Sequence, residues 1–282
     1  MKVLFIGGTG NISTSVSKLA VLKGIDLYLL NRGKSSVDIP GTKSIICDIT
    51  KPDELKKSLA DMQWDVVVNW IAFTENDIIR DIELFSGKTK QYIFISSASV
   101  YQKPVSHPVI TESTPTANPY WEYSRNKIAC EEKLIHAYRE QNFPITIVRP
   151  SHTYGTIIPD AIGQGDYTIV DRMKKGKKII IHGDGTSLWT LTHAEDFAVA
   201  FVGLLGHQQA IGHTFHITSD ESLTWNQIYE AIADAINVKA NIVHIPSDFI
   251  CRFDDFQIGN LLGDKTHTVI FDNTKIKTFV PD

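Results

Sequence analysis

Short apolar runs alternate with longer amphipathic stretches throughout the first half of this 282-residue chain. Short, almost wholly apolar runs are typical of strands buried on both faces of a parallel sheet, and the stretches between them have helical spacing. The alternation therefore predicts consecutive βαβ units. Because their crossover connections are right-handed almost without exception, we expect an α/β fold built on a Rossmann-like doubly wound parallel sheet.

The positions of the elements follow from the same two periods. The predicted strands are Val3–Ile6, Leu27–Leu30, Ser44–Cys47, Val66–Asn69, Tyr92–Ile95 and Ile145–Val148. The predicted helices are Ser13–Lys23, Pro52–Ala60, Asp77–Phe85, a helix from Tyr123 through Tyr138, and, later in the chain, His193–Leu205 and Trp225–Ile236.

After Pro150 the alternation loosens, and turn-rich or basic segments such as Gly155–Gly165 and Lys174–Lys178 interrupt it. We expect two parts. Residues 1–155, with 190–217 packing back on them, form a dinucleotide-binding Rossmann domain. The remaining residues, 156–189 and 218–282, form a smaller C-terminal substrate-binding lobe.

Composition narrows the classes of partner and compartment. The formal net charge of −4 gives no overall excess of cations to neutralise a phosphate backbone, so nucleic acid is an unlikely main ligand. The longest mostly apolar run, Val66–Phe73, is too short to span a bilayer, and we expect no membrane association. Three widely separated cysteines fit a reducing cytoplasm.

We expect no metal site. The cysteines form no CxxC pair, and the spacing of His207, His213 and His216 matches no zinc signature. The segment around the last two histidines has the pattern of a turn that leads into a strand.

The stretch FIGGTGNIS places Gly7, Gly8 and Gly10 between a buried strand and a helix. Glycines there let the backbone approach a pyrophosphate, while the helix start offers free N–H groups. The alternative is a plain β-to-α turn. Ser13 stands where such turns have a third glycine for helix packing. Its hydroxyl can bond back to its own helix, so we expect nucleotide binding to survive and to weaken.

The second predicted strand ends at Asn31 and Arg32, where a carboxylate usually binds the ribose hydroxyls of NAD. An amide beside a guanidinium, with Lys34 close by, tolerates or favours a 2′-phosphate, so the predicted cofactor is NAD or NADP. A solvated loop charge is the alternative for Arg32. Asp48 and Ile49, past the third strand, are placed to meet an adenine edge.

The stretch PYWEYSRNK places Tyr123 and Lys127 four residues apart on one helix face. A nearby ammonium, together with the positive nicotinamide ring, lowers the pKa of a phenol from about 10 toward a value useful for a base. Taken alone, this pattern is common and mostly structural. Ser97, just beyond the fifth strand, lies at the edge where doubly wound sheets bind ligands, and it can share a substrate oxygen with Tyr123.

In this order, the motifs resemble those of the extended short-chain dehydrogenase/reductase superfamily, in an atypical subgroup of its NAD-dependent epimerase/dehydratase family. The matching stretches are GGTGNI at the start, CDIT at Cys47–Thr50, SSASVY at Ser96–Tyr101, YSRNK at Tyr123–Lys127, RPSHTYG at Arg149–Gly155 and HAEDFA at His193–Ala198. The resemblance extends over nearly the whole chain.

The resemblance implies a catalytic set of Ser97, Tyr123 and Lys127, with Tyr123 as general base, for hydride transfer on a hydroxyl of a sugar or nucleotide sugar. It also implies a homodimer. The implied cofactor-binding residues are Gly7, Thr9, Gly10, Asn11, Ile12, Asn31, Arg32, Asp48, Ile49, Trp70, Ala72, Tyr123, Lys127 and Pro150. The implied substrate residues are Ser99, His152 and Trp189.

The chain departs from the family pattern at the substrate side. Ala98 and Ser99 replace the adjacent acidic pair of 4,6-dehydratases, which argues against that reaction. Trp189 and Thr190 replace an arginine and an aspartate, and the arginine grips a nucleotide-sugar diphosphate. Trp189 can stack on a ligand or fill the core of the lobe. The opening also resembles plant chloroplast proteins that bind RNA, so a cofactor-binding regulatory or RNA-associated protein without catalysis is the alternative function.

Overall fold

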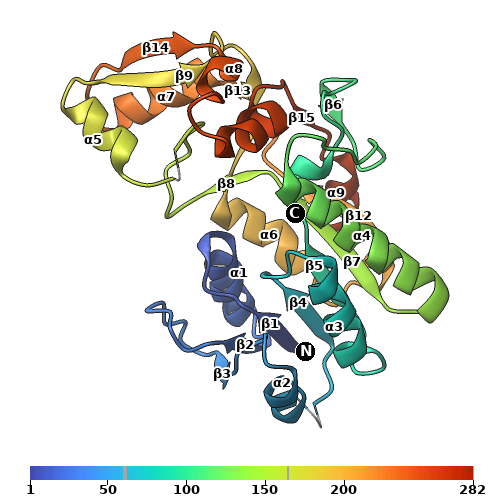
Figure 1. Cartoon of the computed structure of the whole chain (residues 1–282). Coiled ribbons are helices and arrows are strands. Elements are labelled where there is room, and N and C mark those ends of the chain that lie inside the picture. The colour runs from blue at the N-terminus through green and yellow to red at the C-terminus, as the bar shows by residue number, and fades with distance from the viewer. Residues whose placement is uncertain (60–61, 164, 282) are drawn as a thin grey trace.

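A seven-stranded sheet with strand order β12-β7-β5-β4-β1-β2-β3 forms the centre of the computed structural model, which describes residues 1–59, 62–163 and 165–281 (Figure 1). Its strands are β1 (Lys2–Ile6), β2 (Asp26–Asn31), β3 (Lys43–Ile46), β4 (Val66–Asn69), β5 (Tyr92–Ile95), β7 (Ile145–Pro150) and β12 (Thr214–Ile217). All neighbouring strands are parallel. The predicted doubly wound sheet is confirmed, and β12 adds a strand at the edge beyond β7.

Helices cover both faces of this sheet, and β1 shows how the sequence serves both layers. Val3 and Phe5 point into one apolar core, and Leu4 and Ile6 point into the other. The first core also contains residues of α1 (Asn11–Leu22) and α6 (Ala194–Leu204), and the second contains residues of α2 (Pro52–Leu59), α3 (Glu75–Phe85) and α4 (Glu122–Gln141). Continuous apolar strands are therefore needed, because neither face meets solvent.

Two helix starts differ from the predicted ones for reasons of capping. Helix α1 begins at Asn11 rather than Ser13, since Gly10 is its N-cap. Helix α3 begins at Glu75 rather than Asp77, because Thr74 and Asp77 form a capping box. The predicted end of α2, Ala60, lies outside the described residues. Within those residues, no helix combines the length and the apolar character needed to cross a bilayer.

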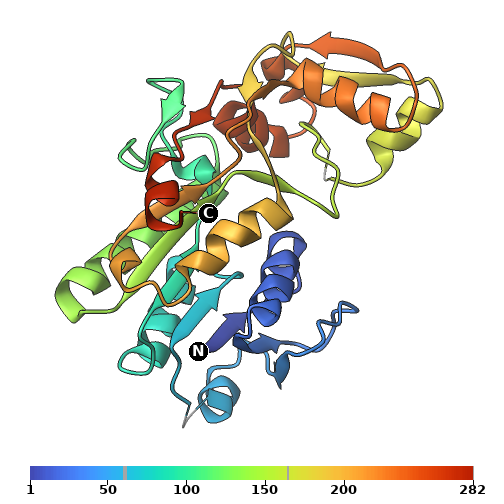
Figure 2. The same cartoon turned by 180° about the vertical axis from the view of Figure 1, so that it is seen from behind.

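A smaller layer, which we call the outer lobe, lies beyond the carboxyl ends of the strands (Figures 1 and 2). It consists of α5 (Thr168–Lys174), β9 (Lys178–His182), α7 (Trp225–Ala235) and β14 (Asn241–Ile245), and β9 and β14 pair in parallel. A third apolar core joins its helices and strands to Tyr101 and Phe271.

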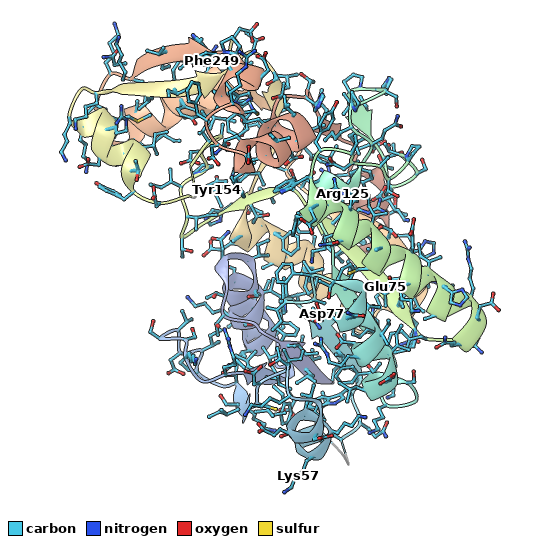
Figure 3. The ribbon with its side chains drawn as sticks, in the orientation of Figure 1. Lys57, Glu75, Asp77, Arg125, Tyr154 and Phe249 are labelled. Carbon is cyan, nitrogen blue, oxygen red and sulfur yellow. The ribbon has the colours of Figure 1, made fainter. Side chains whose placement is uncertain are left out.

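The remaining described elements are short. They are η1 (Ala98–Val100), β6 (Val109–Ile110), β8 (His152–Tyr154), β10 (Leu188–Trp189), β11 (Leu191–His193), η2 (Gln208–Ala210), β13 (Leu223–Thr224), α8 (Ser247–Ile250), η3 (Ile258–Lys265), β15 (Ile270–Phe271) and α9 (Thr274–Phe279). Tyr154, at the end of β8, lies where the chain passes from the sheet toward the outer lobe (Figure 3).

Candidate active site

The glycine turn after β1 forms one wall of a cavity of about 530 Å³. Gly7 and Gly8 have φ of +94° and +109°, a region that side chains other than glycine rarely adopt. A Cβ on Gly8 would lie 2.7 Å from Leu29 Cδ2. The lining residues are Gly7, Gly8, Thr9, Gly10, Asn11, Ile12, Ser13, Trp70, Ile71, Phe73, Ile95, Ser96, Tyr123, Lys127, Pro150, Thr153 and Ile157.

Ser13, which replaces the third glycine, is integrated into this turn. Its Oγ accepts a hydrogen bond from the backbone N–H of Gly10 at 2.8 Å, and the residue is buried. The expectation was a bond within the helix, and the structure shows a bond to the turn instead, because Ser13 is the third residue of α1 and faces the N-cap. One donor of the turn is thus already paired.

Two buried polar atoms in the cavity wall have no partner among the described residues. They are the indole Nε1 of Trp70 and the hydroxyl Oγ of Ser96. Buried polar groups without partners are rare in folded proteins. Together with the glycine cradle and the N-terminus of α1, these free groups fit a polar, anionic dinucleotide.

Asn11 ties the glycine turn to the chain that leads into the outer lobe. Its Nδ2 donates to the carbonyl of Thr153 at 2.9 Å, and its Oδ1 accepts from the backbone N–H and the hydroxyl of Thr156. The sequence predicted Asn11 as a cofactor residue. The structure places it in the cavity wall and also assigns it this bridge.

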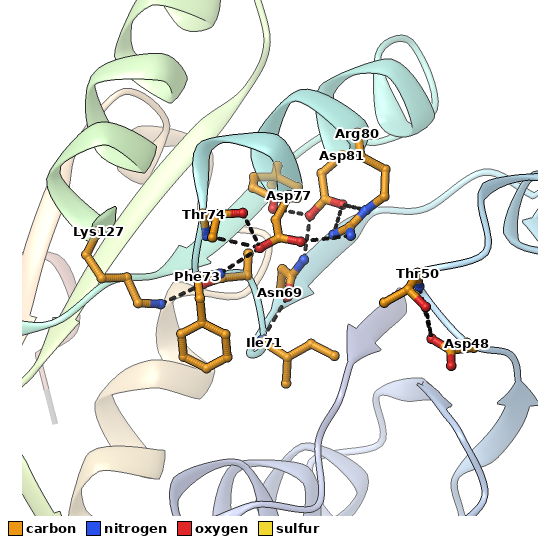
Figure 4. Close-up of polar contacts among 12 residues, drawn as sticks. Asp48, Thr50, Asn69, Ile71, Phe73, Thr74, Asp77, Arg80, Asp81 and Lys127 are labelled. Atoms are coloured by element: carbon orange, nitrogen blue, oxygen red, sulfur yellow. Dashed lines mark hydrogen bonds and ion pairs between the residues drawn. The ribbon is translucent and has the colours of Figure 1, made fainter. Parts of the chain in front are cut away.

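Several predicted cofactor residues lie outside this cavity wall. Asn31 uses its Oδ1 to accept from the backbone N–H of Gly33, and Arg32 is exposed. The carboxylate of Asp48 accepts from the backbone N–H and hydroxyl of Thr50 (Figure 4). Ile49 packs against the second apolar core, and Ala72 is fully buried. Their roles toward a nucleotide stay predictions.

Helix α4 presents Tyr123 and Lys127 to the cavity. The Lys127 ammonium donates to the backbone carbonyls of Ala72 at 2.7 Å and Ile95 at 2.8 Å, and it lies 5.8 Å from the centroid of the Tyr123 ring. The Phe73 ring lies 4.5 Å from the same ammonium. Lys127 is therefore held at the ends of β4 and β5, beside the phenol.

Within the protein itself, burial dominates the electrostatics of this pair, and the predicted lowering of the phenol pKa, which also relied on the nicotinamide ring, stays a prediction. Burial raises the pKa of Tyr123 above its usual value, and contact with the Ser97 hydroxyl opposes this rise. Burial lowers the pKa of Lys127 to about 8. The desolvation of both groups dominates, since the ammonium is directed at two carbonyls rather than at the phenol oxygen.

A polar network after β4 holds the loop that contributes Trp70, Ile71 and Phe73 to the cavity (Figure 4). Asn69 donates through Nδ2 to Asp81 and accepts through Oδ1 from the backbone N–H of Ile71. The carboxylates of Asp77 and Asp81 also bind Arg80. Asp77 accepts from the backbone N–H groups of residues 73 and 74.

A second cavity, of about 430 Å³, adjoins the first on the side of the outer lobe. It is lined by Ser97, Ala98, Ser99, Tyr101, Lys103, Ile110, Trp121, Tyr123, Pro150, Ser151, His152, Ile157, Trp189, Asp264, Lys265, Val269 and Phe271. Tyr123, Pro150 and Ile157 line both cavities. The phenol thus stands in the wall between them.

The three predicted substrate residues all line this second cavity. Ser99 is buried, and its hydroxyl contacts those of Ser97 at 2.9 Å and Ser124 at 2.7 Å, so it also positions Ser97. Burial lowers the pKa of His152 to about 3, which keeps that ring neutral. Trp189 stacks on Trp225 with ring centroids 5.6 Å apart, and it therefore fills the lobe core as well as lining the cavity.

Three charged residues and one tryptophan of this cavity were not predicted from the sequence: Lys103, Asp264, Lys265 and Trp121. Trp121 is two residues before Tyr123, and this proximity was a usable signal. The other three lie on a loop and on η3, where no periodic sequence pattern indicates a site.

Most of the chain matches one family of known proteins. A sequence profile described as the NAD dependent epimerase/dehydratase family matches residues 3–218. The chain belongs to this family. Its cofactor is accordingly a nicotinamide dinucleotide, for which the glycine cradle and the two free polar atoms provide a fitting site.

Two relatives with different names show the range of sequence similarity. The chain is 26% identical over 252 residues to 2′-dehydrokanamycin reductase of Streptomyces kanamyceticus, which covers 88% of this chain and 70% of that protein. It is 28% identical over 264 residues to the chloroplast stem-loop binding protein of 41 kDa b of Arabidopsis thaliana. That alignment covers 88% of this chain and 67% of the Arabidopsis protein.

Solved structures share the fold. Pal from Bacillus thuringiensis has a TM-score of 0.79 at 21% identity, over 99% of this chain and 93% of that one. The dTDP-glucose 4,6-dehydratase of Bacillus anthracis, solved in complex with NAD, has a TM-score of 0.78 at 19% identity, over 99% and 89%.

Proposed function

We propose that this protein is a nicotinamide-dependent oxidoreductase or epimerase that acts on a hydroxyl-bearing carbon of a sugar or nucleotide sugar. Its relatives include one named 2′-dehydrokanamycin reductase and one named UDP-glucose 4-epimerase, from Lactobacillus helveticus. The observation that carries the proposal is the position of Tyr123 in the wall shared by the two cavities.

In this proposal each member of the predicted catalytic set has one task. The Tyr123 phenol takes the proton of the substrate hydroxyl, and the Ser97 hydroxyl donates a hydrogen bond to the same oxygen. Lys127 keeps a positive charge beside the phenol while bound to two carbonyls. A bound nicotinamide ring would accept or return the hydride of the substrate carbon that carries this hydroxyl. Pro150 and Ile157 line both cavities beside the phenol.

The test is a turnover assay of the full chain with NAD or NADP and a panel of nucleotide sugars and glycosides. Absorbance of the reduced nicotinamide follows net oxidation, and product analysis detects an epimerase. We expect Tyr123→Phe to lower kcat by about 10²- to 10⁴-fold, the usual contribution of a general base. Tyr120→Phe is the matched control, since Tyr120 does not line either of the two cavities. Equal activity of wild type and Tyr123→Phe would exclude the assigned base.

The similarity to the chloroplast stem-loop binding protein favours a second candidate, a cofactor-binding protein that associates with RNA. Binding of this kind depends on counterion release and falls steeply with salt. A titration with stem-loop RNA at several salt concentrations distinguishes the candidates. Tight, salt-dependent RNA binding without turnover of any panel member supports the second candidate, and a flat titration excludes it.

Three further expectations stay predictions: the homodimer, the cytoplasmic location and the division into residues 1–155 with 190–217 against 156–189 with 218–282. Light scattering of the purified chain tests the first. Fractionation of the source cells tests the second, and limited proteolysis near residues 155 and 218 tests the third.

A further inference from the structure

Lys103 is a buried cation in the wall of the second cavity that the proposed chemistry does not use. The residue is 4% exposed, and its ammonium carries three hydrogen-bond donors. Its one polar contact within the described residues is the Oδ1 atom of Asp264 at 3.7 Å, which is beyond hydrogen-bond distance. A buried ammonium with free donors is costly unless a ligand or water satisfies it.

Asp264 is the matching acceptor on the opposite wall. It belongs to η3, its side chain is 16% exposed, and it makes no side-chain hydrogen bond within 3.5 Å among the described residues. Burial raises the pKa of Asp264 and lowers that of Lys103. Both charged forms therefore gain from a polar group that enters the cavity between them.

The separation of these two atoms matches one bridging oxygen. A gap of 3.7 Å is too long for a direct bond, but an oxygen placed about 2.8 Å from each atom fits between them. A hydroxyl can accept from the ammonium and donate to the carboxylate at the same time. A phosphate can only accept, and an ammonium group can only donate.

The charges around the pair leave no surplus of either sign. Lys265 faces the same cavity and donates to Asn260, and the carboxylates of Asp264 and Asp160 both attract its charge, so two carboxylates balance the two ammonium groups. Burial lowers the pKa of the neighbouring His267, so that ring stays neutral near pH 7. A charged substrate group would therefore meet one like and one opposite charge at close range and gain little net attraction, whereas a hydroxyl can satisfy both groups.

The remaining wall suits a flat, partly apolar ring. Tyr101, Trp121, Trp189 and Phe271 contribute aromatic surface to the cavity, which has no arginine among its described lining residues. The nearest buried arginine, Arg149, is paired with Glu131 and stacks on Tyr101. Bidentate recognition of a diphosphate, which arginine provides best, is missing from this wall.

From this arrangement, and resting on the proposed function, we propose that Lys103 and Asp264 together bind a hydroxyl of an uncharged sugar ring and select against substrates that place a phosphate or an ammonium group there. The pair thus sets specificity. It points to neutral glycosides rather than nucleoside diphosphate sugars as the substrate class.

The test measures binding to the full chain saturated with NADH, by calorimetry. The probes are the methyl glycosides of glucose, galactose and mannose, with glucose 6-phosphate, glucosamine and UDP-glucose as charged counterparts. We expect at least one methyl glycoside to bind about tenfold more tightly than every charged probe. Asp264→Asn removes the negative charge and should improve glucose 6-phosphate binding about tenfold while weakening the glycoside. Lys103→Gln should improve glucosamine binding instead.

Asp234→Asn and Lys177→Gln are matched controls at exposed positions and should leave all affinities unchanged. Circular dichroism checks folding, and if Lys103→Gln does not fold, Asp264→Asn decides alone. Tighter binding of UDP-glucose or glucose 6-phosphate than of every glycoside, no glycoside binding, or unchanged selectivity in Asp264→Asn overturns this inference. If the wild-type protein does not bind NADH, that result contradicts the proposed function instead.

Discussion

The hydroxyl of Ser13 accepts a hydrogen bond from the backbone N–H of Gly10, so the serine that replaces a glycine in the nucleotide turn also caps the helix that follows. The substitution therefore exchanges one free donor of the turn for a more rigid helix start. This exchange explains how the turn keeps its shape without the third glycine.

Ser13→Gly should reverse that exchange. Loss of the capping bond and the added backbone freedom should lower the free energy of unfolding by about 1 kcal/mol. The freed Gly10 N–H should tighten NADH binding, measured by fluorescence titration. Ser13→Ala is the control, because it also frees the donor but keeps the Cβ. Weaker NADH binding in both variants would show that the hydroxyl supports the site.

Gly8→Ala should destabilise the protein more than Gly24→Ala. Both glycines have positive φ, at +109° and +76°, so both variants incur about 1–2 kcal/mol of backbone strain. Only at Gly8 does the new Cβ also clash, 2.7 Å from Leu29, whereas the space around Gly24 is open within 4 Å. Overpacking adds about 1–3 kcal/mol. Urea unfolding compares the two, and equal losses would contradict the steric argument.

Lys127 should make stability rise with alkaline pH. Its pKa is about 8 in the folded protein and about 10.5 in the unfolded chain, so between these values the unfolded state binds more protons. Raising the pH from 8 to 10.5 should therefore relieve up to about 3 kcal/mol of destabilisation. Lys127→Met should lack this rise relative to wild type, as measured by urea unfolding across that range. Parallel pH profiles would contradict the lowered pKa.

Glu131→Gln should cost about 3–5 kcal/mol of unfolding free energy, because it leaves the buried Arg149 guanidinium without its counter-charge. The Nη1 atom of Arg149 already lacks a partner among the described residues, so little can replace the lost contact. Thermal unfolding of the variant measures the loss. The double variant Glu131→Leu/Arg149→Met should recover most of it, and failure to recover would indicate that shape rather than charge dominates.

Local sequence pattern sufficed for the sheet and its main helices. Strand β1 is apolar at every position after Lys2, and β4 is apolar at every position before Asn69. Such runs predict burial on both faces before any contact is known. The predicted helix starts were less accurate, because the exact backbone path decides that Gly10 and Thr74 are the N-cap residues.

The predicted site residues that line the cavities could be found from the order of motifs and strands along the chain. Glycines after β1, Ser97 after β5 and Tyr123 on α4 all stand at the carboxyl ends of parallel strands, which meet at one edge of the sheet. Charge states did not follow in this way. Burial raises the pKa of Tyr123 within the protein itself, and burial is a property of the packed protein and not of the four-residue spacing.

By itself, the sequence determined the sheet, the nucleotide turn and the phenol-lysine pair, because each depends on residues close together in the chain or on a repeated topology. Only the tertiary structure decided that Lys103 and Asp264 face each other, that Trp189 stacks on Trp225, and that Tyr123 divides two cavities. The physical reason is that such contacts join distant, non-periodic segments, whose approach is fixed by the packing of the whole core.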